Sequence, residues 1–371
     1  MGRDTRIGTA LVLGAWNRRG VAGQILWGLL LPWSAVYRVV VGVRNWLYGS
    51  GLLTPRRLGL PVVSVGNITV GGTGKTPTGL WLAQGLRRRG LNAAILTRGY
   101  GGRRTDTRPA TINPETARAW LDEPQGDLLD YGDEPVMLSA IYGQTVIVGA
   151  DRFRAGMELT REPGDTDLFL LDDGFQHRKL ARDLDLVLLG ADCAGSMLPA
   201  GPFREPIRAL RRADIVVVTG AHQRWRTMLR GRFDESRIFF ASLSPRGLLG
   251  RTEDGLKELS LGELAGSRVL AVCAVAMPER FYDAIRECEA TIIETLEFPD
   301  HHSYSEGDWR EINRNRNQVD MIVTTEKDYV KLARFPFSTG KLMALRVEMS
   351  VDRAEELLDR VADAVKKAAS P

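Results

Sequence analysis

The chain has 371 residues, of which 44% are hydrophobic and 26% are charged, and its formal net charge is +4 at pH 7. This length allows two domains with cores of their own, and the composition excludes an intrinsically disordered chain. The mild positive charge suits an anionic membrane surface or a phosphorylated substrate. No Lys/Arg run is interleaved with aromatic residues, which argues against nucleic acid. The three cysteines form no CxxC pair, which indicates a reducing compartment, and nothing in the sequence implies a protein partner.

An apolar segment lies near the N-terminus, at residues 21–43, and is interrupted by Gln24, Pro32 and Arg38. The aromatic residues in or beside it are Trp27, Trp33, Tyr37, Trp46 and Tyr48. A spanning helix needs about 20 apolar residues without charge, whereas aromatic and arginine residues at this density are typical of helices in the headgroup region. The favoured prediction is peripheral or monotopic attachment to a membrane surface. A helix buried on the soluble core ranks second, and a true span third.

The segment 70–78 reads Val-Gly-Gly-Thr-Gly-Lys-Thr-Pro-Thr and follows the apolar run 61–65. A strand that ends in glycines, then Lys-Thr and then a helix predicts a phosphate-binding loop. The general motif has glycine where this chain has Thr69, so a glycine-rich turn without phosphate is the competing interpretation. The preceding strand and the helical pattern over 79–89 favour phosphate binding. The predicted nucleotide-binding residues are Thr69, Val70, Gly71, Gly72, Thr73, Gly74, Lys75 and Thr76.

Two of these residues have specific predicted roles. The ammonium group of Lys75 adds a point charge for the phosphates, and the hydroxyl of Thr76 is offered to Mg²⁺.

Beyond this loop, apolar strands alternate with helical stretches. The predicted strands are 93–97, 145–148, 168–171, 184–189 and 215–219, and the predicted helices are 114–121, 135–142 and 151–160. This alternation predicts an α/β fold, with a parallel sheet that carries helices on both faces. The ligand is expected at the C-terminal ends of the strands.

A second alternating set of strands and helices occupies residues 269–325. Two strand-like segments, 238–243 and 342–347, flank this set and are expected to pair as a linker that tethers a smaller α/β domain. The predicted domains are a membrane-associated segment at 1–58, a phosphate-loop core at 59–237, the smaller domain with its linker strands at 238–350, and a C-terminal helix at 351–371.

The predicted strand 168–171 ends in Asp172 and Asp173, and His177 follows shortly after. In phosphate-loop enzymes an acid at this place holds Mg²⁺ opposite the Thr hydroxyl. An Asp-Gly pair is also a common turn at the end of a strand. Two acids and a histidine at one strand exit favour the metal site, without deciding which aspartate is the ligand.

Two further acids, Asp133 and Glu134, stand at a predicted helix start. Capping of the helix explains one of them, and a general base for an attacking hydroxyl is the alternative. The pattern alone does not separate these two interpretations.

The chain contains four histidines, and three of them lie in motifs that also carry aspartate. One such motif is 298–304, Phe-Pro-Asp-His-His-Ser-Tyr, which includes His301. A histidine beside an aspartate can accept or share a proton at neutral pH. No partner cysteines and no His-x₃-His spacing are present, so zinc is not predicted.

Two charged positions in loops complete the candidates. Arg204 lies in the Pro/Gly-punctuated loop 198–206, where it would clamp a phosphate or pair with Glu205. Glu326 lies in the charged run 324–328 at the end of a predicted strand, where it would face a nucleotide or form a solvated helix start.

Taken together, these motifs resemble the tetraacyldisaccharide 4′-kinases, the lipid A 4′-kinases of Gram-negative bacteria. The matching segments follow the family's order and are 64–77, 98–101, 132–135, 172–178, 198–206, 278–281, 298–302 and 325–331. The resemblance implies transfer of the γ-phosphoryl group of ATP to the 4′-hydroxyl of a tetraacyldisaccharide 1-phosphate in the bilayer, which forms the lipid IVA precursor of lipid A. It also implies Mg²⁺ as a cofactor and a location on the cytoplasmic face of the bacterial inner membrane.

The resemblance further assigns roles to residues. Asp133 would take the 4′-hydroxyl proton and would be tuned by His301 from the smaller domain. With Lys75 and Asp172 these two residues form the expected catalytic set. The expected Mg²⁺ ligands are Thr76 and Asp173, and the candidates for other contacts to substrate or phosphate are Glu134, His177, Arg204 and Glu326. A base assembled from two domains would act only on closure, which restrains wasteful ATP hydrolysis.

Two functions of other classes compete with the lipid kinase. A membrane-attached phosphate-loop NTPase that acts as a hydrolysis-driven switch would explain the loop and the acid pair, but not the Arg204 loop or the paired histidine. A non-enzymatic nucleotide-sensing module would have no need of Asp133.

Overall fold

The computed structural model describes residues 11–370 except 13, 103–107, 125, 127, 162–163, 193, 254 and 315. Residues 1–10 of the predicted membrane segment, Cys193 and Pro371 therefore lie outside the described residues. Cys273 and Cys288 both carry free thiols, and Cys273 is buried.

A run of parallel strands forms the centre of the molecule, in the spatial order β7-β6-β1-β5-β2-β4. Their bounds are β1 (Val62–Asn67), β2 (Ala93–Thr97), β4 (Thr145–Val148), β5 (Leu168–Asp172), β6 (Leu184–Leu189) and β7 (Ile215–Val218). In register, Val62 of β1 lies opposite Phe169 of β5, and Val63 lies opposite Leu184 of β6. Nearly every residue of these strands is buried, as expected for a parallel sheet that is covered on both faces. The predicted parallel sheet is confirmed.

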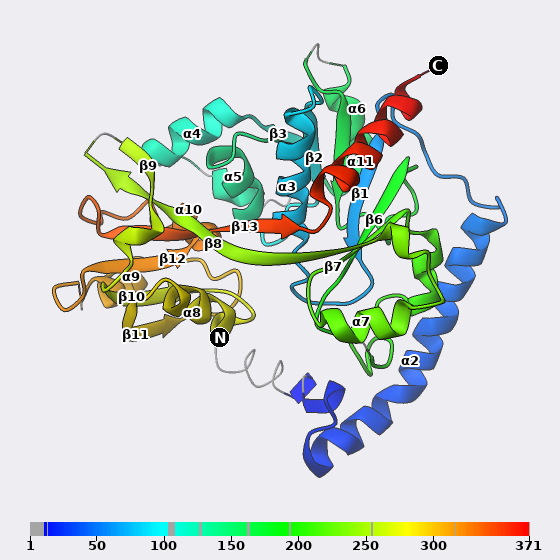
Figure 1. Ribbon diagram of the computed structural model, residues 1–371, viewed down its shortest axis with the longest axis horizontal. Helices are drawn as coiled ribbons and strands as arrows, with labels where there is room; N and C mark the ends of the chain where they lie inside the picture. The colour runs from blue at the N-terminus through cyan, green and yellow to red at the C-terminus, as the bar shows by residue number, and fades with distance from the viewer. Residues whose placement is uncertain are drawn as a thin grey trace.

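Helices cover both faces of this sheet (Figure 1). On one face, Val63 and Val65 share a hydrophobic core with residues of α3, α4, α5 and α11. On the other face, Phe169 packs with Ala155 of α6, and Val187 belongs to a core that includes Trp225 of α7. The bounds are α3 (Lys75–Arg87), α4 (Pro114–Asp122), α5 (Asp133–Ala140), α6 (Arg152–Leu159), α7 (His222–Leu229) and α11 (Ala354–Ala369).

A second parallel group of strands, β11-β10-β12, continues the sheet on the far side of β13 and β8. Its strands and helices are β10 (Arg268–Cys273), α8 (Pro278–Glu287), β11 (Thr291–Glu297), α9 (Glu306–Arg314), β12 (Met321–Thr325) and α10 (Glu326–Leu332). In Figure 1 this group occupies the side opposite α2. The predicted alternation of this region is confirmed, and α10 is a further helix, whose start was one of the two interpretations of the charged run 324–328.

The strands β8 (Ile238–Thr252) and β13 (Leu342–Val351) join the two groups. They pair antiparallel, as predicted, from Ala241 opposite Val351 to Gly250 opposite Met343. The first residues of β8 also pair in parallel with β7, so one strand belongs to both groups. The predicted strand 238–243 stopped too early, because the polar residues after it are exposed in the ribbon between the groups rather than forming a loop. We propose the domain boundaries given above on the basis of this ribbon.

Further differences from the predicted elements concern shorter segments. The helix α3 begins at Lys75, four residues before the predicted start, and α7 was not predicted. The strands β3 (Ala110–Ile112) and β9 (Gly255–Leu259) pair antiparallel with their neighbours and were not predicted, since β3 has only three residues and β9 is largely exposed without an apolar run.

The apolar N-terminal segment forms one long helix, α2 (Gly20–Gly49), with Pro32 inside it. One face of α2 docks on the loop that carries Arg204. Ser34 Oγ donates to Met197 O at 2.8 Å, and Tyr37 OH donates to Arg204 O at 3.2 Å. The opposite face exposes large apolar side chains, namely Val21, Ile25, Leu29, Trp33, Val36, Val39, Val40, Val43 and Trp46. By length and composition α2 is a candidate to cross a membrane, although such a helix alone is weak evidence for a span.

The C-terminal part of α2 is anchored by a buried carboxylate. Glu205 is fully buried and pairs with Arg44 of α2 at 2.8 Å and with Arg212 at 2.7 Å, and Asn45 donates to it at 3.0 Å. A buried charge is tolerated only when it is paired and hydrogen-bonded. Glu205 therefore fixes where α2 meets the core.

We predict that Glu205→Ala loosens the attachment of α2, because it leaves Arg44 and Arg212 without their partner. Breaking a buried pair costs on the order of 3 kcal/mol. Hydrogen–deuterium exchange of residues 34–49 should therefore speed up by more than tenfold. Arg211→Ala, at the exposed position next to Arg212 in the 3₁₀ segment Ile207–Arg212, is the control and should change nothing. Unchanged exchange in the Glu205 variant would show that this ion pair does not hold the helix.

Candidate active site

The glycine-rich loop connects β1 to α3 in a shaped turn. Gly71 and Gly74 have φ values of 110° and 81°, a region that glycine adopts without strain. Gly74 is the N-cap of α3, so Lys75 and Thr76 are the first residues of this helix. Two hydrogen bonds hold the loop, from Asn67 Nδ2 to Thr73 Oγ1 at 2.9 Å and from Thr219 Oγ1 to Thr73 O at 2.8 Å. A rigid loop at a helix N-terminus is suited to bind an anion.

Thr69 and Val70 differ from the other loop residues because they contact the Arg204 loop. Thr69 is buried and forms an isolated β-bridge with Phe203. The amide of Val70 donates to Pro202 O at 2.8 Å. The Val70 amide is therefore already hydrogen-bonded and Thr69 is covered, so the first backbone amide beyond this contact is that of Gly71.

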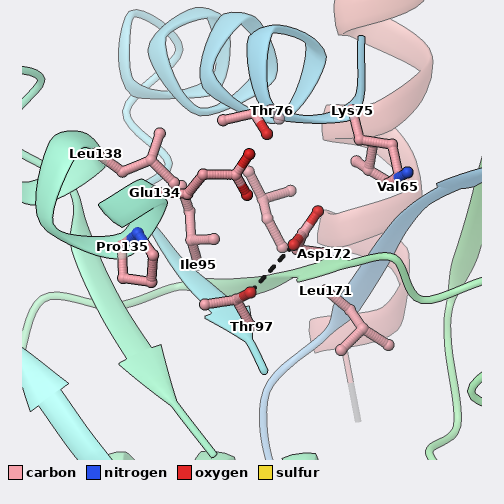
Figure 2. A pocket seen from close by; sticks show the side chains of 12 residues that line it. Val65, Lys75, Thr76, Ile95, Thr97, Glu134, Pro135, Leu138, Leu171 and Asp172 are labelled. Atoms are coloured by element: carbon pink, nitrogen blue, oxygen red, sulfur yellow. Dashed lines mark hydrogen bonds between the residues drawn. The ribbon is translucent and has the colours of Figure 1, made fainter. Parts of the chain in front are cut away.

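A pocket opens beside this loop, at the C-terminal ends of β5 and β2 (Figure 2). Its lining includes Lys75, Thr76, Glu134 and Asp172, together with apolar side chains such as Leu138. Thr97 Oγ1 donates to Asp172 Oδ2 at 3.0 Å. Glu134 comes from the start of α5, so four separate elements, α3, β2, α5 and β5, supply the polar groups. The pocket lies where the alternating pattern predicted the ligand.

The two neighbouring aspartates have opposite electrostatic environments. Burial, followed by the nearby charges of Glu134 and Asp173, raises the pKa of Asp172 to about 6. Burial also acts on Asp173, but the charges of Lys75 and Arg204 outweigh it and lower the pKa of this carboxyl. Arg204 Nη1 lies 2.7 Å from Asp173 Oδ2, and Lys75 Nζ lies 3.7 Å from its other oxygen. Of the two aspartates, Asp173 is therefore the one neutralised by neighbouring cations, whereas the surroundings of Asp172 disfavour its charge.

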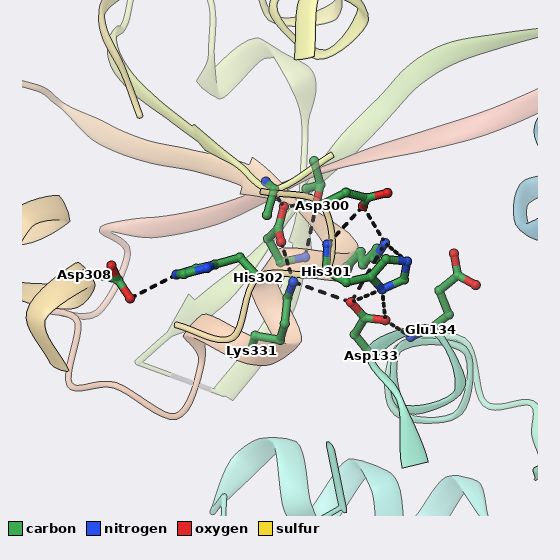
Figure 3. A network of polar contacts seen from close by, with 11 residues as sticks. Asp133, Glu134, Asp300, His301, His302, Asp308 and Lys331 are labelled. Atoms are coloured by element: carbon green, nitrogen blue, oxygen red, sulfur yellow. Dashed lines mark hydrogen bonds and ion pairs between the residues drawn. The ribbon is translucent and has the colours of Figure 1, made fainter. Parts of the chain in front are cut away.

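A second cluster forms around Asp133 (Figure 3). Both carboxylate oxygens of Asp133 lie 3.2 Å from His301 Nδ1, and Lys331 Nζ is 3.5 Å from Oδ2. The Glu134 amide donates to Asp133 Oδ1 at 3.0 Å. The N-cap of α5 is Gly132, so Asp133 is the first residue of the helix, and its carboxylate bonds one of the free amides of the first turn. The same carboxylate contacts His301, so a helix-start role and the predicted role in proton transfer are compatible.

The charge of Asp133 is stabilised by residues of the second parallel group, from α10 and from the loop after β11. Burial alone would favour the neutral acid, but the hydrogen bond to His301 and the charges of Lys327 and Lys331 outweigh it and lower the pKa of Asp133. Asp133 is therefore ionised at neutral pH.

The remaining candidates take different positions. Arg204 pairs with Asp173, whereas Glu205 is bonded to other arginines, so the alternative of an Arg204–Glu205 pair is wrong. Burial, followed by the charge of Arg152, lowers the pKa of His177 to about 4 and keeps it neutral. The carboxylate of Glu326 accepts hydrogen bonds from Tyr142 and from Arg346, so the structure does not aim it at the pocket.

Sequence reasoning missed three residues of the two clusters. Thr97 is the last residue of β2 and carries no motif that would identify it. Lys327 belongs to the charged run 324–328, which was interpreted as a nucleotide contact or a solvated helix start. Lys331 lies just after this run, on the same helix. Only a helical wheel over α10, where positions 327 and 331 share a face, would have grouped these two lysines.

Comparison with known proteins identifies the family. The family model of the tetraacyldisaccharide-1-P 4′-kinases matches residues 26–366. A tetraacyldisaccharide 4′-kinase from Syntrophus aciditrophicus is 40% identical over 342 residues, which cover 87% of this chain and 89% of the relative. Another from Geobacter sulfurreducens is 39% identical over 325 residues, which cover 85% and 86%.

A solved structure agrees with these relatives. The “apo” form of LpxK from Aquifex aeolicus, in complex with ATP, matches with a TM-score of 0.72 at 29% identity. The match covers 92% of this chain and 99% of that chain. The predicted resemblance is confirmed: the chain belongs to the tetraacyldisaccharide 4′-kinase family.

Proposed function

We propose that the protein is an ATP-dependent kinase that transfers the γ-phosphoryl group to the 4′-hydroxyl of a tetraacyldisaccharide 1-phosphate. One observation carries this proposal. The adjacent residues Asp133 and Glu134 join the two clusters, because Glu134 lines the phosphate-loop pocket and Asp133 contacts His301. A base beside a phosphate pocket is what transfer to an alcohol requires.

The nucleotide would be held by the open part of the glycine loop. The amides of 71–74 and the start of α3 supply hydrogen-bond donors, and Lys75 supplies a cation on the phosphates. The presence of ATP in the related LpxK structure supports this assignment.

The residues of the pocket fit Mg²⁺. Thr76 and Asp172 line one pocket, and the raised pKa of Asp172 reflects negative charge that a cation would relieve. Among the described residues no group of three acid, histidine or cysteine side chains forms a metal cage, and Mg²⁺ needs only one or two protein carboxylates beside phosphates and water. Asp172 suits the metal better than Asp173, which is bonded to Arg204. When bound, the ion would neutralise charge on the transferred group.

The acceptor hydroxyl would reach the site from the Asp133 side. Phosphoryl transfer depends mainly on placement and charge neutralisation, so the base has only two roles. It holds the hydroxyl in line, and it takes the hydroxyl proton as the new bond forms. An ionised, immobile carboxylate performs both roles.

The substrate of such a kinase carries acyl chains, and the exposed apolar face of α2 would bring the enzyme to the bilayer. We infer attachment to the cytoplasmic face of the inner membrane, where ATP is present, with α2 lying on or in that surface. The Trp and Val side chains on this face support the inference.

The hydrolysis-driven switch is not favoured by the family membership. ADP formation with and without a lipid disaccharide acceptor separates the two functions, because a switch would turn over without lipid.

We predict that Asp133→Asn lowers kcat by 10²- to 10⁴-fold, the usual contribution of a positioned base, while ATP still binds. The assay follows labelled phosphate from ATP to a tetraacyldisaccharide 1-phosphate. Asp130→Asn, three residues away, is the matched control and should keep its rate. Near-normal transfer by the Asp133 variant would remove this residue from the chemistry. Absence of transfer by the unaltered protein would refute the proposed function.

We also predict a pH-dependent need for Mg²⁺. A pKa raised to about 6 means that the Asp172 carboxyl is protonated below that pH, and a protonated acid does not bind the ion. The Mg²⁺ concentration for half-maximal rate should rise about tenfold between pH 7 and pH 5. Asp172→Asn should need high Mg²⁺ at every pH, whereas the exposed control Asp165→Asn should behave like the unaltered protein. A requirement that does not change with pH would contradict the role of Asp172.

The double variant Val36→Asp/Val40→Asp should lose at least tenfold in association with anionic lipid vesicles. Both side chains are more than half exposed on α2, and each aspartate in an apolar membrane zone costs on the order of 2–3 kcal/mol. Co-sedimentation measures the effect. Gln223→Asp/Thr227→Asp on α7 has the same charge and spacing and serves as the control. Equal binding of both variants would show that this face of α2 is not the membrane contact.

A further inference from the structure

The ring of His301 is held between an acid and a cation. Its Nδ1 lies 3.2 Å from both oxygens of Asp133, and its Nε2 lies 3.2 Å from Lys327 Nζ. The ring sits edge-on to Tyr100, with the ring centroids 5.2 Å apart. His301 has a φ of 59°, which is uncommon for a residue with a side chain and indicates a backbone fixed by its surroundings.

Lys327 is itself held in its charged form. Its Nζ lies 3.2 Å from Asp300 Oδ1 and 3.9 Å from Asp133 Oδ2. Burial works against its charge, but the nearby carboxylates of Asp133, Asp300 and Glu134 outweigh it and raise the pKa of Lys327. A protonated ammonium group has three donors and no acceptor.

The protonation of His301 follows from this contact. Because Lys327 can only donate, Nε2 of His301 must be the accepting nitrogen, and a neutral ring then carries its proton on Nδ1. That proton points at Asp133. Free imidazole groups favour the opposite tautomer, so the arrangement has to be imposed by the protein.

We propose that Lys327 is a positioning residue that fixes His301 as the Nδ1–H tautomer, so that His301 donates a hydrogen bond to Asp133 and does not take a proton from it. This inference rests on the proposed function, because it concerns the base of that reaction. Asp133 then keeps the proton of the acceptor hydroxyl until it exchanges with solvent or product. Lys331, 2.8 Å from the buried Asp328, holds the other side of the Asp133 carboxylate.

Two consequences separate this role from simple structural support. The first is spectroscopic, since the ¹⁵N shifts of a histidine distinguish the protonated ring nitrogen from the bare one. The second is kinetic: Lys327 touches the base and its histidine but lies outside the lining of the nucleotide pocket, so kcat should fall while the KM for ATP is kept.

The experiment records ¹⁵N-histidine spectra of the full-length protein at pH 7.5. The chain has only four histidines, and a His301→Asn variant assigns the signal. We expect Nδ1 protonated and Nε2 bare in the unaltered protein, and a shift toward the Nε2–H tautomer in Lys327→Met. The Met variant should lose at least tenfold in kcat, with partial recovery in Lys327→Arg. Lys366→Met, on the exposed end of α11, is the control for loss of a lysine and should match the unaltered protein.

The spectra do not depend on turnover, so the inference and the proposed function can fail separately. An Nε2–H tautomer or a doubly protonated ring in the unaltered protein would overturn the inference, as would an unchanged tautomer and rate in Lys327→Met. Should the Met variant misfold, the spectrum of the unaltered protein and the Arg variant still decide. A correct tautomer without any phosphoryl transfer would refute the proposed function instead.

Discussion

The burial of the Asp133 carboxylate is the constraint on which the site depends. A charged acid with 6% of its side chain exposed is stable only beside cations and donors. The half of the molecule that contains β1 to β7 supplies one amide, from Glu134. His301, Lys327 and Lys331 come from the other half, which contains β10 to β12 and their helices. The surroundings that keep Asp133 ionised therefore depend on contact between the two halves. The β8–β13 ribbon that joins the halves is the element that sets this contact.

A second set of contacts connects the N-terminal helix α2 to the glycine-rich loop between β1 and α3. The helix α2 is bonded to the loop 196–205, the same loop bonds to Val70 of the glycine-rich turn, and its Arg204 neutralises Asp173. The segment that would contact the bilayer is therefore connected to the phosphate site through a short chain of direct contacts. This arrangement suits an enzyme whose nucleotide is soluble and whose acceptor remains in a lipid phase.

Much of the fold and part of the site were accessible from the sequence. The parallel strands were predicted nearly to their ends because buried strands read as continuous apolar runs, and the glycine loop was found because its backbone needs glycine. The start of α10 was only one of two interpretations of its charged run, because charged residues such as Asp328 are buried in ion pairs, which removes the apolar periodicity. The partner of Arg204 was not readable either, since Asp173 is 31 positions away and the two meet only through tertiary packing. For Asp133, the pattern left capping and base chemistry even, and the structure adds a contact with His301 that the sequence order does not reveal.

The central claim is that Asp133 and His301 act as one unit assembled across the two halves. A double-mutant cycle on kcat measures this directly, using Asp133→Asn, His301→Asn and the combination. If the histidine works only through the aspartate, the double variant will be no slower than Asp133→Asn alone. If instead the two losses multiply, the residues act independently and the account of the site is wrong.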